Sequence, residues 1–131
     1  MSGTKAILDS NVIILASKEM IDVEEMFSRY DEFFASTISY AEVYAFEFTN
    51  QLEKDIADEI FANLTLIDFD KNIADRAIIY RKNKTKKIKL PDAIILASAK
   101  YANAEPLTDD WDDFQNIDSA VIVTNIDDLK I

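Results

Sequence analysis

The chain has 131 residues, 49% of them hydrophobic, and a formal net charge of −11, so we expect one packed domain with no general attraction to nucleic acid. It contains no cysteine and no histidine, which excludes disulfide scaffolds, thiolate zinc sites, cysteine nucleophiles and a Ser-His-Asp triad within the chain. The one glycine, at position 3, leaves no glycine-rich loop for a nucleotide phosphate.

Hydrophobic patterning predicts strands that alternate with helices. In chain order we expect a strand at 5–8, helices at 11–17 and 23–30, a strand at 32–36, helices at 39–50 and 52–62, a strand at 64–68, helices at 73–80 and 92–102, and strands at 106–108 and 121–124. This order predicts an α/β fold, a single domain over residues 1–131. Its central, mostly parallel sheet would have about five short strands with helices on both faces.

No run of about 18 apolar residues is present to cross a membrane. No leader-like apolar segment precedes the first expected strand. We therefore expect a cytoplasmic protein.

Four acidic residues are placed where such a fold brings distant segments together: Asp9, Glu42, Asp92 and Asp110. Asp9 ends the first expected strand, and Asp110 follows the strand at 106–108. Glu42 and Asp92 lie near the starts of helices. Strand ends and helix starts share the carboxyl edge of a parallel sheet, where open α/β folds bind ligands. Carboxylates gathered there repel one another, which favours a hard divalent cation as their ligand.

Each of these acids also has an ordinary structural interpretation. Asp9 suits a helix N-cap, as do the two residues that follow it. Segment 39–42 has the Ser-x-x-Glu pattern of a capping box, which would occupy Glu42. Asp92 in a first helical turn favours the helix dipole. The acid-rich segment 108–114 reads as a solvated loop, and the residues alone leave both interpretations open.

Charge is unevenly distributed. Residues 81–90 hold six of the 14 basic residues and no acid, whereas residues 105–113 hold five acids and no base. The basic run is either a solvated loop or a segment that binds a phosphate backbone. The candidates for phosphate contacts are Lys84, Lys86, Lys87 and Lys89. Further candidates for positioning substrate or water are Ser10, Asn11 and Thr108. Three aromatic residues either stack on bases or pack in the core: Tyr40, Tyr44 and Trp111.

Four segments resemble the motifs of the PIN-domain family, in particular its small VapC-type ribonuclease toxins. They are Ile-Leu-Asp-Ser-Asn-Val at 7–12, Thr-Ile-Ser-Tyr-Ala-Glu-Val at 37–43, Asp-Ala-Ile-Ile-Leu-Ala at 92–97 and Leu-Thr-Asp-Asp-Trp-Asp-Asp-Phe at 107–114. The likeness spans roughly residues 5–124. Two departures concern substrate and rate: Asp109 replaces a common basic residue, and the glycine often found before the third motif is absent.

The resemblance implies an endoribonuclease that depends on Mg²⁺ or Mn²⁺, with Asp9, Glu42, Asp92 and Asp110 as catalytic metal ligands. Asp9 and Asp92 would bind the ion directly, and the other two directly or through water. A cation that activates water suits a chain without a histidine base. The family also implies a homodimer and a small cognate antitoxin as partners in a type II toxin–antitoxin pair. A surface for a partner is expected in the apolar residues of 46–61: Phe46, Phe48, Ile56, Ile60 and Phe61.

Three other functions compete with this one. A structure-specific DNA nuclease would use the same carboxylates, and a catalytically inactive PIN scaffold would bind protein partners. A phosphoacceptor receiver domain is also acidic and α/β, but it needs an acidic pair near the first strand, where this chain has only Asp9.

Overall fold

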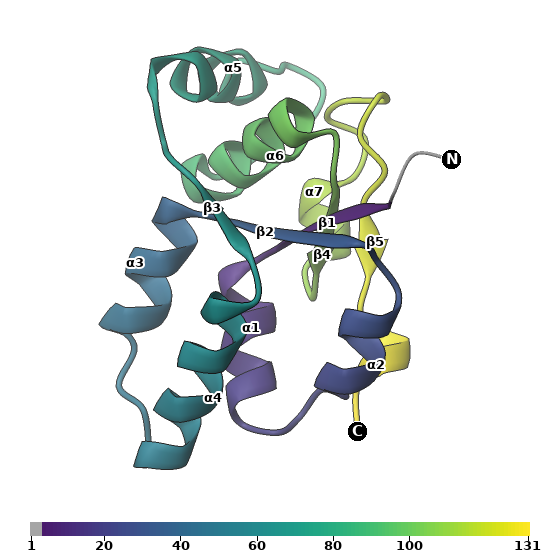
Figure 1. The fold of residues 1–131 in the computed structure, drawn as a ribbon. Helices are drawn as coiled ribbons and strands as arrows, with labels where there is room; N and C mark the ends of the chain where they lie inside the picture. Colours follow the sequence, from purple (N-terminus) through teal and green to yellow (C-terminus); the bar gives the residue numbers. More distant parts are fainter. Residues whose placement is uncertain (1–3) are drawn as a thin grey trace.

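The computed structural model describes residues 4–131, in which five strands form one parallel sheet of order β3-β2-β1-β4-β5 (Figure 1). The strands are β1 (Lys5–Leu8), β2 (Glu32–Ser36), β3 (Thr65–Ile67), β4 (Glu105–Thr108) and β5 (Thr124–Asn125). The α-helices are α1 (Ser10–Ser17), α2 (Val23–Ser28), α3 (Thr37–Ala45), α4 (Gln51–Ala62), α5 (Lys71–Arg81), α6 (Leu90–Ala102) and α7 (Trp111–Phe114), and a 3-10 turn, η1, covers Asp127–Leu129. The expected α/β fold is confirmed.

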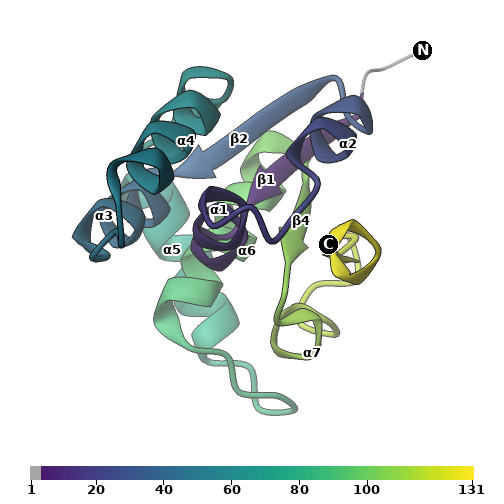
Figure 2. The same cartoon turned by 90° about the horizontal axis from the view of Figure 1, so that it is seen from below.

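The central strand β1 determines where the other strands end. Ile7 is in register with Phe34 of β2 and with Pro106 of β4, and both pairings are parallel. The carboxyl ends of β1, β2 and β4 therefore meet at one edge of the sheet. Figure 2 shows β1 leading there into α1 and β4 leading into α7, close to the beginning of α6.

Alternation along β1 divides the core between the two faces of the sheet, because successive side chains in a strand point to opposite sides. Leu8 packs in a cluster with residues of α1, α2 and α4, whereas Ile7 packs in a cluster with residues of α5, α6 and α7. Figure 1 shows α5 and α6 on one side of the sheet and α1, α2 and α4 on the other. Helices on both faces are thus confirmed.

Helix α3 differs most from its expected bounds, 39–50. The Ser36 hydroxyl accepts a hydrogen bond from the Ile38 N–H at 3.1 Å, so α3 begins at Thr37, and it ends at Ala45. Asn50 then caps α4 by accepting from the Glu53 N–H at 3.0 Å. The capping-box interpretation of 39–42 is wrong, because the cap lies three residues earlier and Glu42 falls in the second turn.

Two further differences lie near the C-terminus. Strand β5 is formed by Thr124–Asn125 rather than 121–124, because only these residues pair with Leu107 and Thr108 of β4. The acid-rich segment 108–114 contains a helical turn, α7, where a loop was expected. The other elements begin and end within two residues of the predicted bounds. Among residues 4–131, no helix is long and apolar enough to span a bilayer.

Candidate active site

Asp9 is buried at the carboxyl end of β1, with 4% of its surface exposed. It occupies the N-cap position of α1 with an extended backbone, yet its side chain makes no capping hydrogen bond. Its Oδ2 instead accepts a hydrogen bond from the Thr108 hydroxyl of β4 at 3.1 Å. The side chain is therefore held toward the neighbouring strand, and helix capping does not account for it.

The electrostatic surroundings of Asp9 raise its pKa to about 7. Burial is the largest cause, because it penalises the charged form, and repulsion from Asp92 comes next. Asp110 adds a smaller repulsion, while the hydrogen bond from Thr108 acts in the opposite direction. Acids from β1, α6 and the start of α7 thus act on one another across space.

Asp92 is the third residue of α6, directly after Pro91, and is partly buried. Its pKa is raised to about 6, first by burial, then by repulsion from Asp113 and Asp110. Lys89 lowers this pKa, and Glu42 of α3 raises it. Helices α3, α6 and α7 therefore contribute acids to the same region.

Asp110 and Glu42 are exposed, unlike Asp9 and Asp92. The amide of Asn11 donates to Asp110 Oδ2 at 3.4 Å, and the N–H of Asp110 donates to the Thr108 hydroxyl at 2.9 Å. Thr108 is fully buried and so connects Asp9 with the backbone of Asp110. In this structure Asn11 and Thr108 orient carboxylates, while Ser10, also buried, begins α1 beside Asp9.

A divalent cation such as Mg²⁺ or Ca²⁺ binds to several oxygen donors, from the protein or from water. Among residues 4–131, no group of three or more acidic side chains is arranged so that it could hold an ion as it stands. Within the same residues, none of the four predicted ligands forms an ion pair with a lysine or an arginine. Mg²⁺ commonly binds through one or two carboxylates and keeps several waters, so a complete cage is not required. Oxygen donors that repel one another without a neutralising base fit such an ion.

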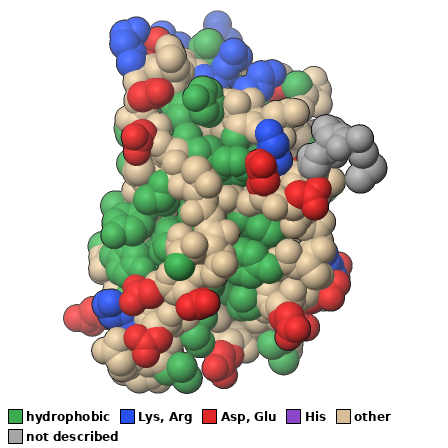
Figure 3. Space-filling model, in the orientation of Figure 1, with side chains coloured by type: hydrophobic (Ala, Val, Ile, Leu, Met, Phe, Trp, Pro, Cys, Tyr) green, Lys and Arg blue, Asp and Glu red, His purple; other side chains and the backbone are tan. Residues whose placement is uncertain are grey.

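The basic run lies beside this site but divides into two roles. The Lys86 ammonium donates to the carbonyl oxygens of Asp112 and, at 2.7 Å, of Gln115, which ties the loop to α7. Lys84, Lys87 and Lys89 are exposed. Basic side chains gather at the top of the face in Figure 3, over α5 and the segment that follows it. Lys86 is thus engaged within the protein, and the other three remain available to a substrate.

The structure shows properties of two further residues, Asp113 and Ser39, that the sequence did not reveal. Asp113 contributes more repulsion to Asp92 than Asp110 does. The sequence could have indicated this by spacing. Asp113 lies three residues after Asp110, and one helical turn brings residues at this spacing to the same side of a helix. Ser39, one turn before Glu42, is buried, and its hydroxyl has no hydrogen-bond partner among residues 4–131.

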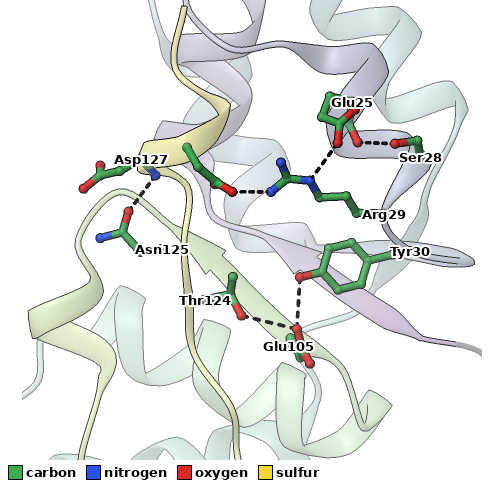
Figure 4. A network of polar contacts seen from close by, with 9 residues as sticks. Glu25, Ser28, Arg29, Tyr30, Glu105, Thr124, Asn125 and Asp127 are labelled. Atoms are coloured by element: carbon green, nitrogen blue, oxygen red, sulfur yellow. Dashed lines mark hydrogen bonds and ion pairs between the residues drawn. The ribbon is translucent and has the colours of Figure 1, made fainter.

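Polar contacts hold the C-terminal segment against the rest of the domain (Figure 4). Arg29, at the end of α2, donates to Asp128 of η1 at 2.8 Å. Glu105 of β4 accepts from the hydroxyls of Tyr30 and Thr124 at 3.0 and 3.2 Å. Strand β5 and η1 are therefore fixed to α2 and β4.

Lys130 connects this segment to the site. Its ammonium pairs with Asp109 at 2.5 Å and with Asp127 at 3.2 Å. Asp109 is the residue that departs from the expected motif, and it directly precedes Asp110. The acid at this position thus has a basic partner from the C-terminus, which restrains the loop that carries Asp110.

The acidic residues lie at the carboxyl edge of a parallel sheet, where open α/β folds bind ligands. The family model for the PIN domain matches residues 6–120, so the chain belongs to the PIN-domain family. Nucleases of this family generally use divalent metal ions. The expected resemblance is confirmed.

Solved structures with the same fold include toxin–antitoxin complexes. VapBC2 from Rickettsia felis, bound to a DNA fragment from its promoter, has a TM-score of 0.77 and 22% identity, covering 95% of this chain and 100% of that chain. A toxin–antitoxin complex from Klebsiella pneumoniae has a TM-score of 0.74 and 26% identity, covering 90% and 96%. DNA-bound VapBC from Salmonella typhimurium has a TM-score of 0.74 and 20% identity, covering 93% and 98%. No curated protein sequence matches the chain significantly.

Proposed function

We propose that the chain is a divalent-metal-dependent endoribonuclease that hydrolyses RNA phosphodiester bonds and is the toxin of a type II toxin–antitoxin pair. The observation that carries this proposal is the environment of Asp9. Burial and the charges of Asp92 and Asp110 raise its pKa to about 7, with Thr108 as its hydrogen-bond donor. The charged form of a carboxylate in such surroundings destabilises the fold unless a cation binds to it.

Mg²⁺ or Mn²⁺ would be held by Asp9 and Asp92, with Glu42 and Asp110 completing the site directly or through water. Such an ion, when bound, lowers the pKa of a water and neutralises charge on a phosphate oxygen. The chain's own residues orient the donors. Thr108 fixes Asp9 from β4, and the amide of Asn11 contacts Asp110 from α1.

An acidic site also needs an attraction for RNA. The exposed Lys84, Lys87 and Lys89 precede Asp92 in the chain and would contact phosphates beside the bond that is cut. Lys89 already acts on the site, because it lowers the pKa of Asp92. Positive charge next to the carboxylates would therefore offset the repulsion between an acidic protein and a polyanion.

The surface of this chain that suits an antitoxin is an apolar groove between α2 and α4. The groove has a volume of about 490 Å³, and its hydrophobic lining comprises Val23, Phe27, Phe33, Ile56 and Ile60. Figure 3 shows hydrophobic side chains gathered between these two helices. Ile56 and Ile60 belong to the residues from which a partner surface was expected. The solved toxin–antitoxin complexes support an antitoxin as the kind of partner.

A homodimer is supported by exposed hydrophobic residues on another part of the surface, β3 and α5 with the turn between them: Leu66, Phe69, Ile78 and Ile79. Burying such residues against a second copy would remove apolar surface from water. We place the protein in the cytoplasm, where an RNA-cleaving toxin meets its substrate.

Cleavage of matched RNA and DNA strands of one sequence tests the function. Wild type should cut the RNA with Mg²⁺ or Mn²⁺, leave the DNA intact, and be inactive in chelator. Asp92→Asn should be inactive, while Asp55→Asn, which changes an exposed acid on α4, should match wild type. Equal cleavage of DNA would favour the structure-specific DNA nuclease, and no cleavage of either strand would favour the inactive scaffold.

A further inference from the structure

A second hollow lies on the side of α7 that faces the basic run. It has a volume of about 550 Å³. Its walls include Asn83 and Thr85 from the basic run, Trp111 and Gln115 from α7 and its C-cap, and Val121 and Val123 from the segment before β5. Lys86 closes the loop onto α7 from one side through its bonds to the carbonyl oxygens of Asp112 and Gln115.

Trp111 gives this hollow a flat aromatic wall. The residue directly follows Asp110, and 36% of its surface is exposed. Its indole N–H donates to the carbonyl oxygen of Val123 at 3.1 Å, which restrains the orientation of the ring. A restrained and partly exposed indole can stack on a base without first losing much side-chain freedom.

Amide groups supply a donor and an acceptor around the ring. The side-chain oxygen of Asn83 accepts from the N–H and the hydroxyl of Thr85, at 2.9 and 2.6 Å, so its NH₂ group remains as a donor. The NH₂ group of Gln115 donates to Asp112 at 3.0 Å, so its oxygen remains as an acceptor. Unstacked nucleobases carry both kinds of group on their edges.

The charge around the hollow suits a nucleic acid strand. Lys84 and Lys87 are exposed on the same loop and can contact phosphates. Asp118 also lines the hollow, but its carboxylate accepts from the Tyr80 hydroxyl at 2.6 Å and pairs with Lys100 at 3.5 Å. Its negative charge is therefore largely satisfied within the protein.

We propose that this hollow is a nucleobase subsite, in which a base of single-stranded nucleic acid stacks on Trp111 beside the carboxylate cluster. The inference deepens the proposed nuclease function, since it gives the enzyme a preference for unpaired over paired substrate. A base in a duplex is stacked between its neighbours and cannot present its face to a side chain. Because Trp111 directly follows Asp110 in the chain, the nucleotides next to a base held in the hollow would be within reach of the acids.

Tryptophan fluorescence tests the subsite without cleavage, because Trp111 is the single tryptophan of the chain. The wild-type protein in chelator is titrated with a single-stranded oligoribonucleotide and with an abasic ribose-phosphate strand of the same length. Binding of each is followed separately by the anisotropy of an end label. We expect the base-containing strand to quench the tryptophan emission saturably and the abasic strand to bind without comparable quenching. Equal responses to the two strands, or binding of the base-containing strand without quenching, would overturn the proposal.

Variants separate stacking from a structural role of the tryptophan. Trp111→Leu should raise KM for RNA roughly 5- to 150-fold with little change in kcat, and Trp111→Phe should recover most of that loss. Val121→Phe, which enlarges another side chain that lines the hollow and leaves α7 unchanged, should also raise KM. Tyr101→Leu is the matched control, since Tyr101 is an exposed aromatic residue nine positions beyond Asp92 on α6, about 14 Å along the axis.

The outcomes distinguish the subsite from the nuclease function on which it rests. If wild type cuts RNA and both Trp111→Leu and Val121→Phe keep the wild-type KM, the subsite is wrong and the nuclease stands. If no cleavage occurs under any condition while base-dependent quenching is seen, the nuclease is wrong and the subsite stands.

Discussion

Replacing Asp9 with asparagine should stabilise the metal-free protein at neutral and alkaline pH. The pKa of Asp9 is about 7 in the fold against an ordinary value of 3.8, so the folded state binds more protons than the unfolded state between these values. The free energy of unfolding of wild type therefore falls as pH rises from about 4 to about 7, and the full penalty remains above pH 7. Asp92, with a pKa of about 6, acts in the same direction.

The magnitude follows from the same pKa. One pKa unit corresponds to about 1.4 kcal/mol, so a charged Asp9 costs the fold at most about 4 kcal/mol above pH 7. Asparagine keeps an oxygen that can accept from Thr108 but buries an incompletely satisfied amide, which returns about 1–3 kcal/mol of this gain. We expect a net gain of about 1–3 kcal/mol, or a rise in Tm of roughly 3–10 °C.

Thermal melting followed by circular dichroism at pH 5, 6, 7 and 8, in chelator and then in saturating Mn²⁺, measures this difference. Wild type should gain about 2–3 kcal/mol from the metal at a hundredfold excess over Kd, and Asp9→Asn should gain much less. Asp55→Asn is the control for an exposed acid and should melt like wild type in every condition. If Asp9→Asn melts below wild type at pH 8 in chelator, or if Mn²⁺ does not change the Tm of wild type, Asp9 is structural and the reasoning is refuted.

Three further predictions concern the site and the basic run. Asp92→Asn should abolish RNA cleavage with an unchanged circular dichroism spectrum, and wild-type activity would make Asp92 a helix-dipole residue only. Joint replacement of Lys84 and Lys87 with glutamine should make the slope of log affinity for RNA against log salt concentration less steep by about 0.7 for each lost phosphate contact. An unaltered slope would mean that these lysines belong to a solvated loop. Lys86→Gln should instead lower Tm, because it removes the bonds to Asp112 and Gln115, and a larger effect on the salt slope than on Tm would contradict this role.

The order of the elements could be read from the sequence because it depends on local patterning. Apolar runs bounded by polar residues predicted the five strands, and the alternation with helices placed Asp9, Asp92 and Asp110 at one sheet edge. Bounds failed where two local signals competed. Both Ser36 and Ser39 can cap a helix, and in the fold the hydroxyl of Ser36 is the one that caps α3. The sequence of 121–125 likewise could not show that only Thr124 and Asn125 reach β4.

Only the tertiary structure decided what the acidic and basic side chains do. The sequence suits Asp9 to a helix cap as well as to a site. Its carboxylate is directed toward the site by the hydrogen bond from Thr108 on the neighbouring strand β4. Its protonation depends on burial and on distances to Asp92 and Asp110, and neither quantity is encoded locally. By sequence Lys86 cannot be distinguished from the other lysines of the basic run. In the fold its ammonium donates to a backbone carbonyl at the C-cap of α7. Local patterns specify elements, whereas the charge state and the partner of a side chain depend on residues that are distant in the chain and adjacent in the fold.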